Sequence, residues 1–247
     1  MTILLLCPAF ENAGLFIIGH REYGDIEGLF HVFTFSLFAS PLVVLRLSMV
    51  RDGIPFVLVP MALAAILAFF GLWWAAVPFI AVAGFMVYFF RDPTREIPTG
   101  EGLIVSAADG RVTRIEDGPD RKVVSVFLSP LDVHINRSPI AGRIKQIQYT
   151  VGKKMPATSD EASLLNERNS LLIEGENVTV TCTQIAGILA RRIVCWPREG
   201  DNLERGQRFG LIKFGSRTDL VMPGNCEIAV KIGDRVVGGE TIIARIV

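Results

Sequence analysis

Residues 227–246 read EIAVKIGDRVVGGETIIARI, in which short apolar runs are separated by turn residues. Similar runs recur in much of the chain before this stretch. An apolar run ends at the pair Gly233-Asp234, a second run ends at Gly238-Gly239, and a third run follows. Short β-branched runs that are separated by Gly and Asp turn residues are typical of antiparallel strands. The stretch therefore predicts three strands joined by tight turns.

Similar short runs recur from residue 92 onward, so we expect residues 92–247 to be mainly β, in a compact β-sandwich. Residues 184–192 are the one segment in this region that predicts a short helix. The stretch at 227–246 resembles half of a biotinyl/lipoyl-type barrel-sandwich hybrid, and residues 140–153 are a weaker echo of it. Carrier domains have a lysine at the hairpin tip, where this chain has Gly233-Asp234, so a swinging-arm carrier is not expected. The predicted strands are 103–105, 112–115, 122–128, 142–151, 170–173, 178–185, 208–213, 219–222, 226–230 and 241–247.

Residues 54–90 contain no charged residue, which predicts two consecutive apolar helices rather than one very long helix. Trp73 and Trp74 lie near the middle, where the tip of a helical hairpin would bring them to a lipid–water interface. Arginines flank both ends, at Arg51 and at Arg91, which places both ends on the cytoplasmic side by the positive-inside rule. We expect residues 49–91 to anchor the protein in the cell membrane, with the β domain on the cytoplasmic side.

Residues 1–48 give a weaker signal, and we expect an N-terminal extension of uncertain structure. The run at 29–45 is apolar, but it contains polar residues and is only about the minimum length for a membrane span. The formal net charge is zero, so no basic field favours nucleic acid as a partner. The four cysteines have no C-x-x-C pair, so neither a metal site nor a disulfide framework is expected.

His134 is the sole histidine after residue 31, so acid–base chemistry by an imidazole in the β domain would depend on it. It lies in a polar stretch between Pro130 and Pro139, and a surface or structural histidine is the alternative. Asp109 lies in an Asp-Gly pair, which is most often just a hairpin turn. A carboxylate is also the usual group that orients a base histidine, so Asp109 is a candidate partner of His134.

The pair Gly215-Ser216 is a candidate site of self-cleavage. A serine hydroxyl that a turn aims at the preceding carbonyl gains from proximity and orientation, and glycine permits the close approach. A Gly-Ser pair alone usually marks only a turn. Arg168 lies in a polar segment, which is either a solvated loop or a segment that binds a headgroup. The residues leave both interpretations open.

Five motifs in order resemble those of the phosphatidylserine decarboxylase family, in its short form. They are 89–93 (FFRDP), 106–112 (SAADGRV), 128–137 (LSPLDVHINR), 166–169 (NERN) and 214–217 (FGSR). The resemblance covers the chain from about residue 49 to its end. It implies a pyruvoyl-dependent, membrane-associated enzyme that converts phosphatidylserine to phosphatidylethanolamine in phospholipid biosynthesis.

The resemblance also implies that the precursor cuts itself between Gly215 and Ser216. The β chain, 1–215, and the α chain, 216–247, would stay associated, and Ser216 would become the pyruvoyl cofactor. Ser216, His134 and Asp109 are then the expected catalytic residues, and Asn136, Arg137 and Arg168 are candidates for binding the anionic headgroup.

Two positions depart from the family pattern, and two other functions stay open. Ala107 replaces a proline before Asp109, and Arg137 stands where longer relatives carry a second histidine, so the base for self-cleavage is open. A decarboxylase of a related lipid such as archaetidylserine fits the same residues. A non-enzymatic, membrane-anchored barrel-sandwich adaptor would need only the hairpin and the strands, and it predicts no cleavage. The residues do not decide whether the protein forms a homo-oligomer.

Overall fold

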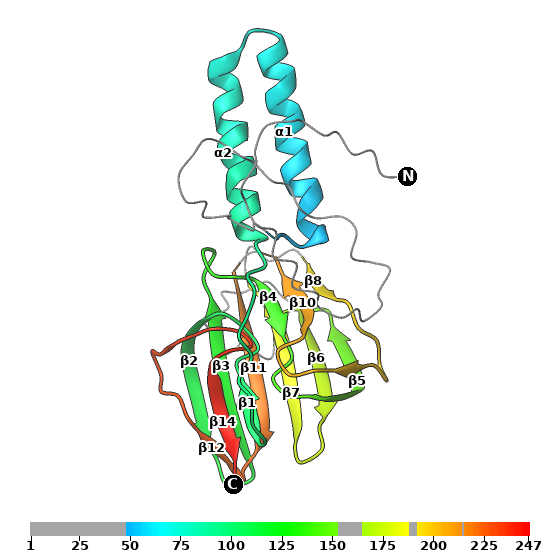
Figure 1. Cartoon of the computed structure of the whole chain (residues 1–247), viewed down its shortest axis with the longest axis vertical. Coiled ribbons are helices and arrows are strands. Elements are labelled where there is room, and N and C mark those ends of the chain that lie inside the picture. Colours follow the sequence, from blue (N-terminus) through cyan, green and yellow to red (C-terminus); the bar gives the residue numbers. More distant parts are fainter. Residues whose placement is uncertain (1–47, 153–164, 188–191, 214) are drawn as a thin grey trace, which may run out of the picture. The chain divides into compact units, whose positions relative to one another are not determined.

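A computed structural model describes residues 48–152, 165–187, 192–213 and 215–247 (Figure 1). These residues form a helical hairpin followed by a domain that is mainly β, which confirms the predicted fold class. The N-terminal extension predicted for 1–48 lies outside the described residues, apart from its last position.

The uncharged stretch forms two helices, α1 (Ile54–Phe69) and α2 (Trp73–Phe89), preceded by a single turn of 3-10 helix, η1 (Arg51–Gly53). Gly71, at φ 77°, lies in the turn between them, where a left-handed backbone favours glycine. Pro60 and Pro78 lie inside the helices rather than at their ends. The helices run side by side and lead away from the strands (Figure 1).

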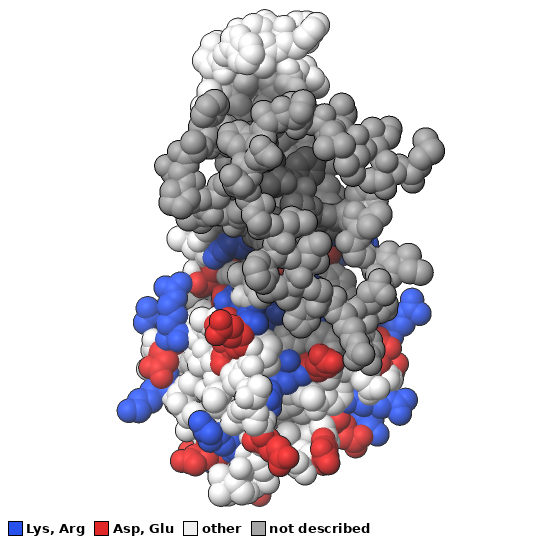
Figure 2. Space-filling model, in the orientation of Figure 1, with Lys and Arg blue, Asp and Glu red and all other residues white. Residues whose placement is uncertain are grey.

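The hairpin is apolar and largely exposed. The stretch Arg51–Phe69 has a mean hydropathy of 2.0 with 17% of it buried, and it is long and apolar enough to cross a bilayer, whereas Trp73–Phe89 is shorter. Trp73 and Trp74 are both exposed at the start of α2. Figure 2 shows that the acidic and basic side chains gather on the β domain, while the visible tip of the hairpin carries none.

The largest sheet has eight strands in the order β13-β2-β3-β11-β7-β6-β5-β9, and every neighbouring pair in it is antiparallel. Two three-stranded sheets, β1-β14-β12 and β4-β10-β8, accompany it. The strand bounds are β1 (Leu103–Val105), β2 (Gly110–Asp117), β3 (Arg121–Leu128), β4 (Ile135–Arg137), β5 (Gly142–Thr150), β6 (Arg168–Glu174), β7 (Thr179–Ala186), β8 (Ile193–Cys195), β9 (Asn202–Leu203), β10 (Arg208–Ile212), β11 (Ser216–Pro223), β12 (Cys226–Ile228), β13 (Arg235–Val236) and β14 (Ile242–Ile246).

The ten predicted strands are all present, and their bounds differ from the prediction by a few residues at most. The helix predicted at 184–192 is wrong at its start, because residues up to Ala186 belong to β7, while part of the remainder lies outside the described residues. The middle one of the three strands predicted within 227–246 is present as β13, whereas three short strands, β4, β8 and β9, were not predicted. Among these, β4 matters most, because it follows His134 directly and fixes that end of the domain.

The described part contains three apolar clusters, of which the smallest joins Ala186, Ile193 and Ile212. The largest one lies within the β domain and joins the eight-stranded sheet to β1 and β14, with Ile104, Leu171 and Phe209 fully buried. The second joins the base of the hairpin to the β domain, because Phe89 and Phe90 pack with Val133, Ile135 and Leu211. The end of α2 therefore meets the segment that carries His134.

Candidate active site

Ser216 is the first residue of β11, a central strand of the eight-stranded sheet, and it is fully buried. It pairs with Leu128 at the end of β3 on one side and with Ala186 at the end of β7 on the other. Its Oγ is buried, and no residue in the described part of the chain forms a hydrogen bond with it. A buried hydroxyl without a partner is costly for stability, which is typical of a group that is kept for chemistry.

The carbonyl that precedes Ser216 is also held by the sheet. Gly215 has a φ of 59°, in the left-handed region that favours glycine, and its carbonyl oxygen accepts a hydrogen bond of 3.1 Å from the N–H of Gly187. This bond continues the pairing of β7 with β11 by one step beyond Ser216 and Ala186. The same N–H could stabilise negative charge that develops on this oxygen.

His134 lies immediately before β4, and only 2% of its surface is exposed. Its carbonyl accepts a hydrogen bond of 3.3 Å from the N–H of Ile212, the last residue of β10. His134 is thus hydrogen-bonded to the end of β10, and Ser216, which starts β11, follows Ile212 by only four positions in the chain. The structure therefore gathers the two predicted residues at the same end of the β domain.

The imidazole of His134 is held in one orientation. Its Nδ1 lies 2.9 Å from the carbonyl oxygen of Asp132, so Nδ1 carries the proton and Nε2 keeps its lone pair. Nε2 is buried and has no hydrogen-bond partner among the described residues. Burial lowers the pKa of His134 to about 4, although the bond to the Asp132 carbonyl opposes this shift. A neutral imidazole with an available Nε2 can accept a proton.

Asp109 does not pair with His134, and the predicted contact between them is wrong. Its carboxylate forms an ion pair of 2.6 Å with Arg95 and accepts a hydrogen bond of 2.8 Å from the N–H of Gly238. Burial raises the pKa of Asp109 above its ordinary value, and Arg95 opposes this shift. The backbone carbonyl of Asp132 takes the position at Nδ1 that the prediction gave to Asp109.

Arg137, which stands in place of the second histidine of longer relatives, belongs to a network of charges near Asp109. It forms an ion pair of 2.9 Å with Asp92, and it also donates to the carbonyls of Pro93 and Gly206. Asp92 pairs with Arg208 as well. Burial lowers the pKa of Arg137, and Asp92 opposes that shift. Arg137 lines a groove of about 510 Å³ together with Arg95, Arg205 and Arg208.

Asn136 is fully buried, and its side chain is used within the protein. Its Oδ1 accepts a hydrogen bond of 2.9 Å from Gln184, and its Nδ2 donates one of 3.0 Å to the Oγ1 of Thr218. Gln184 in turn accepts from Asn169 at 3.0 Å. Thr218 lies on the same face of β11 as Ser216, because side chains alternate along a strand. Asn136 therefore supports the strand that carries Ser216.

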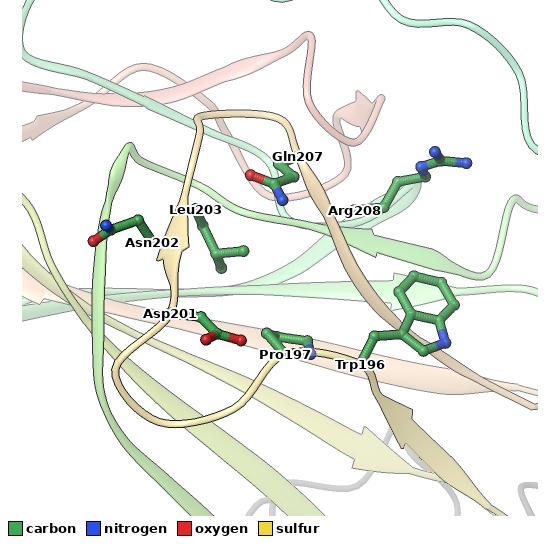
Figure 3. Close-up of a pocket in the computed structure, with 7 residues that line it drawn as sticks. All are labelled: Trp196, Pro197, Asp201, Asn202, Leu203, Gln207 and Arg208. Atoms are coloured by element: carbon green, nitrogen blue, oxygen red, sulfur yellow. The ribbon is translucent and has the colours of Figure 1, made fainter. Parts of the chain in front are cut away.

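Arg168, the remaining headgroup candidate, is the first residue of β6 and pairs with Ile185 of β7. It is half-buried, at the end of the sheet where Ser216 and Ala186 pair. A separate pocket of about 370 Å³ lies beside β9 and β10 and contains none of the candidate residues (Figure 3). Within the described ranges, no cluster of histidine, cysteine and acidic side chains could hold a metal ion.

Three residues of the site escaped the sequence analysis: Gly187, Asp132 and Phe89. Gly187 acts through its backbone, which leaves no signal in a sequence. Asp132 and Phe89 both lie within motifs that resemble the family, LSPLDVHINR and FFRDP. Asp132 is close to His134 in sequence, but nothing indicated that its backbone carbonyl or the ring of Phe89 would contact the imidazole. Phe89 lies with its ring centroid 4.2 Å from that of His134.

The fold and the site define an antiparallel β enzyme in which a buried serine follows a left-handed glycine and a buried neutral histidine lies nearby. Comparison with known proteins gives the particular family. A family model described as "Phosphatidylserine decarboxylase" matches residues 82–244. The chain belongs to the phosphatidylserine decarboxylase family, which confirms the resemblance found in its motifs, and it is a decarboxylase.

Curated relatives cover most of the chain. A "Phosphatidylserine decarboxylase proenzyme" of Symbiobacterium thermophilum is 47% identical over 204 residues, which are 79% of this chain and 94% of the relative. A protein of the same name from Solibacter usitatus is 45% identical over 199 residues, covering 81% of this chain and 97% of the relative. A third, from Nitratidesulfovibrio vulgaris, is 44% identical over 206 residues, covering 81% and 95%. All three are named as proenzymes.

Proposed function

We propose that this chain converts phosphatidylserine to phosphatidylethanolamine in phospholipid biosynthesis, with a pyruvoyl group that it makes from its own Ser216. The observation that carries this proposal is the geometry of the Gly215-Ser216 bond. Ser216 is fully buried with an Oγ that has no hydrogen-bond partner among the described residues, and it directly follows a glycine at φ 59°. The names of the relatives, all proenzymes, support a precursor that is cleaved.

Self-cleavage begins when Ser216 Oγ attacks the carbonyl carbon of Gly215 and gives up its proton to His134 Nε2. The N–H of Gly187, 3.1 Å from the carbonyl oxygen in the uncut chain, stabilises the negative charge that forms there. Collapse of this adduct breaks the Gly215–Ser216 C–N bond, and the Ser216 nitrogen takes a proton, which leaves an ester between the two residues. Elimination across Cα–Cβ then releases the Gly215 carboxylate, and water replaces the nitrogen as ammonia leaves.

His134 is the base in this scheme. Its Nδ1 proton is held by the carbonyl of Asp132, so Nε2 is the nitrogen that accepts a proton. Arg137, which stands where longer relatives carry a second histidine, is tied to Asp92 at 2.9 Å and keeps its charge. Asp109 does not contact the imidazole in this scheme. It holds Arg95 by an ion pair and the backbone of Gly238, just after β13, by a hydrogen bond.

The residues around Ser216 fit a pyruvoyl group. A buried position with an unpartnered oxygen can hold a small ketone, and burial keeps bulk water away from it. When present, this group supplies a carbonyl that accepts electrons as carbon dioxide leaves the substrate. His134 Nε2, which carries no proton in the neutral imidazole, would take one from water and pass it to the substrate carbon. Arg137 and Arg168 provide positive charge for the anionic headgroup.

The helical hairpin would hold the domain at its substrate. A diacyl lipid stays in the bilayer, so the enzyme must work at the membrane surface. The hairpin has no charged residue between Asp52 and Arg91, and the arginines at its two ends, Arg51 and Arg91, favour the cytoplasmic side for both ends. With 16 residues, α1 is about 24 Å long, so it reaches most of the way across the apolar core of a bilayer.

Intact-mass analysis of the purified protein tests self-cleavage. We expect two chains, with the smaller one starting at a pyruvoyl group in place of Ser216. The Ser216→Ala protein should stay whole and be inactive, whereas Ser170→Ala, which changes a half-buried serine of β6, should be processed normally. An active preparation that consists of a single uncut chain would refute the pyruvoyl scheme.

The substrate is tested with the same preparation. We expect vesicles that contain phosphatidylserine to yield phosphatidylethanolamine and carbon dioxide with the wild-type protein and not with Ser216→Ala. Vesicles with an ether-linked archaetidylserine distinguish the two lipid classes, because both carry the same serine headgroup. A faster reaction with the ether lipid would assign the enzyme to that substrate instead.

A further inference from the structure

The last turn of α2 contacts the candidate active site directly. Phe89 is 1% exposed, and its ring lies against the imidazole of His134 with centroids 4.2 Å apart and planes tilted by 31°. Phe89 is the final residue of an apolar helix that is otherwise largely exposed. One side chain of the hairpin thus forms a wall of the histidine site.

Polar contacts tie the same turn of α2 to the segment between β3 and β4 that carries His134. The hydroxyl of Tyr88 donates to the carbonyl of Leu131 at 3.2 Å, and the guanidinium of Arg91 donates to the same carbonyl at 2.9 Å. Arg91 also lies over the ring of Tyr88, 3.8 Å from its centroid. Val133 packs into the apolar cluster that contains Phe89. The helix end and the histidine segment are therefore held together at several points.

The charged groups near His134 come from both sides of this contact. Asp132, on the histidine's own segment, favours the protonated imidazole, and Arg91, from the end of α2, disfavours it. The carboxylate of Asp132 is occupied by the N–H of Ser129 at 2.8 Å and by Arg235 at 2.7 Å. The apolar ring of Phe89 covers one face of the imidazole, and it offers no hydrogen bond that could replace the water it excludes.

We infer that Phe89 is a positioning residue of the active site: its ring fixes the plane of the His134 imidazole and excludes water from it, so that the hairpin is part of the catalytic machinery as well as an anchor. This inference rests on the role of His134 in the proposed function. Phe89 acts through His134 and does not touch the reacting bond.

An ordinary core phenylalanine would also be buried in this place, so the test needs a readout that packing alone would not change. The pKa of His134 is such a readout. Burial holds this pKa at about 4, and an imidazole that regains water should titrate closer to the ordinary value of 6.5. Loss of packing elsewhere in the same cluster should leave it unchanged.

The matched variants are Phe89→Leu and Phe90→Leu. Phe90 is 2% exposed and belongs to the same apolar cluster, and its ring contacts recorded in the structure are with Phe56 and Phe89 rather than with His134. Leucine keeps most of the apolar volume in both variants, so both should fold. Each is made in the full chain, in nanodiscs, with Ser216→Ala added for titration so that the precursor stays whole.

The first measurement is an NMR titration of histidine labelled in its imidazole ring, with His134→Gln to assign the signal among the three histidines. We expect His134 in the otherwise unchanged precursor and in Phe90→Leu to titrate near 4, and in Phe89→Leu at least one pH unit higher. A His134 pKa that is the same in Phe89→Leu and Phe90→Leu would overturn the inference.

The second measurement is the rate of self-cleavage of freshly made precursor, with Ser216 intact, at pH 8 and at pH 5.5. A base with a pKa near 4 is neutral at both, so the ratio of the two rates should be near one. If the pKa rises to about 6.5, the ratio should rise to about ten in Phe89→Leu, because only about a tenth of the imidazole is neutral at pH 5.5. Equal ratios in the two phenylalanine variants would also count against the inference.

A failure of the proposed function looks different from a failure of this inference. If His134→Gln still cuts itself at the wild-type rate, the proposed base is wrong, whatever Phe89 does. If His134→Gln fails to cut and Phe89→Leu behaves like Phe90→Leu in both measurements, the base is right and Phe89 is only packing.

Discussion

Replacing Asn136 by alanine should destabilise the precursor strongly, because Asn136 is the link between two buried polar side chains. The change removes the hydrogen bonds of 2.9 Å from Gln184 and of 3.0 Å to Thr218. It leaves the Nε2 of Gln184 with only a long contact of 3.4 Å to the carbonyl of Val194. Each buried polar group that loses its partner costs about 1–3 kcal/mol, so we expect a loss of roughly 2–5 kcal/mol in the free energy of unfolding.

The assay is thermal unfolding of the Ser216→Ala precursor in detergent, with and without Asn136→Ala. A loss of that size should lower Tm by roughly 4–20 °C in a protein of this length. Ser170→Ala is the control, because Ser170 is half-buried and its bond of 3.0 Å to Thr183 lies outside the chain of amides. Its cost should be about 1 kcal/mol or less.

The reasoning is refuted if Asn136→Ala unfolds at the same temperature as Ser170→Ala. Such a result, combined with a raised KM for phosphatidylserine in an enzyme that still processes itself, would return Asn136 to the role of a headgroup ligand. A lowered Tm with slower self-cleavage would place its importance in the support of β11.

Two further predictions concern the cleavage turn and the effect of pH. Gly215→Ala should slow self-cleavage and lower the free energy of unfolding by about 1–2 kcal/mol, because alanine resists a φ of 59° even though its Cβ would meet nothing within 4 Å. Gly110→Ala is the comparison. Its Cβ would collide with the carbonyl of Phe127, so it should cost more in the same denaturation assay. His134 takes up a proton at about pH 6.5 when unfolded and at about 4 when folded, so it adds stability above pH 6.5 that is lost as the pH falls toward 4. The loss should be about 3 kcal/mol in the free energy of unfolding. The measurement compares the denaturation midpoints of the Ser216→Ala precursor with and without His134→Gln, and the difference between them should change over this pH range. A constant difference would contradict the burial of His134.

The sequence predicted the elements whose signal is local. A long uncharged stretch with arginines at both ends can form little else than an apolar hairpin, and β-branched runs between glycines predicted ten strands. It also predicted Ser216 and His134 as candidate site residues, since His134 is the sole histidine after residue 31. These features depend on neighbours in sequence or on composition.

The parts that could not be predicted depend on partners distant in sequence. The strand β4 reads as a polar loop, because Asn136 and Arg137 face inward only where Gln184, Thr218 and Asp92 satisfy them. The contact between Asp109 and His134 was wrong for the same reason. Arg95 pairs with the carboxylate of Asp109, and the backbone carbonyl of Asp132 contacts Nδ1 of the imidazole.

The position of β11 also has a consequence for the order in which folding and the proposed self-cleavage occur. The strand that starts at Ser216 lies between β3 and β7 and pairs with both along most of its length, so the proposed cleavage would leave the first strand of the small chain in the middle of the largest sheet. If the chain cuts itself as proposed, we expect folding to come before the cut, because a separate fragment could not nucleate that sheet alone. Refolding of the mature enzyme would need two chains to meet, which makes it dependent on concentration, whereas the precursor folds as one molecule. The protein would then have one efficient opportunity to fold, before it acquires its activity.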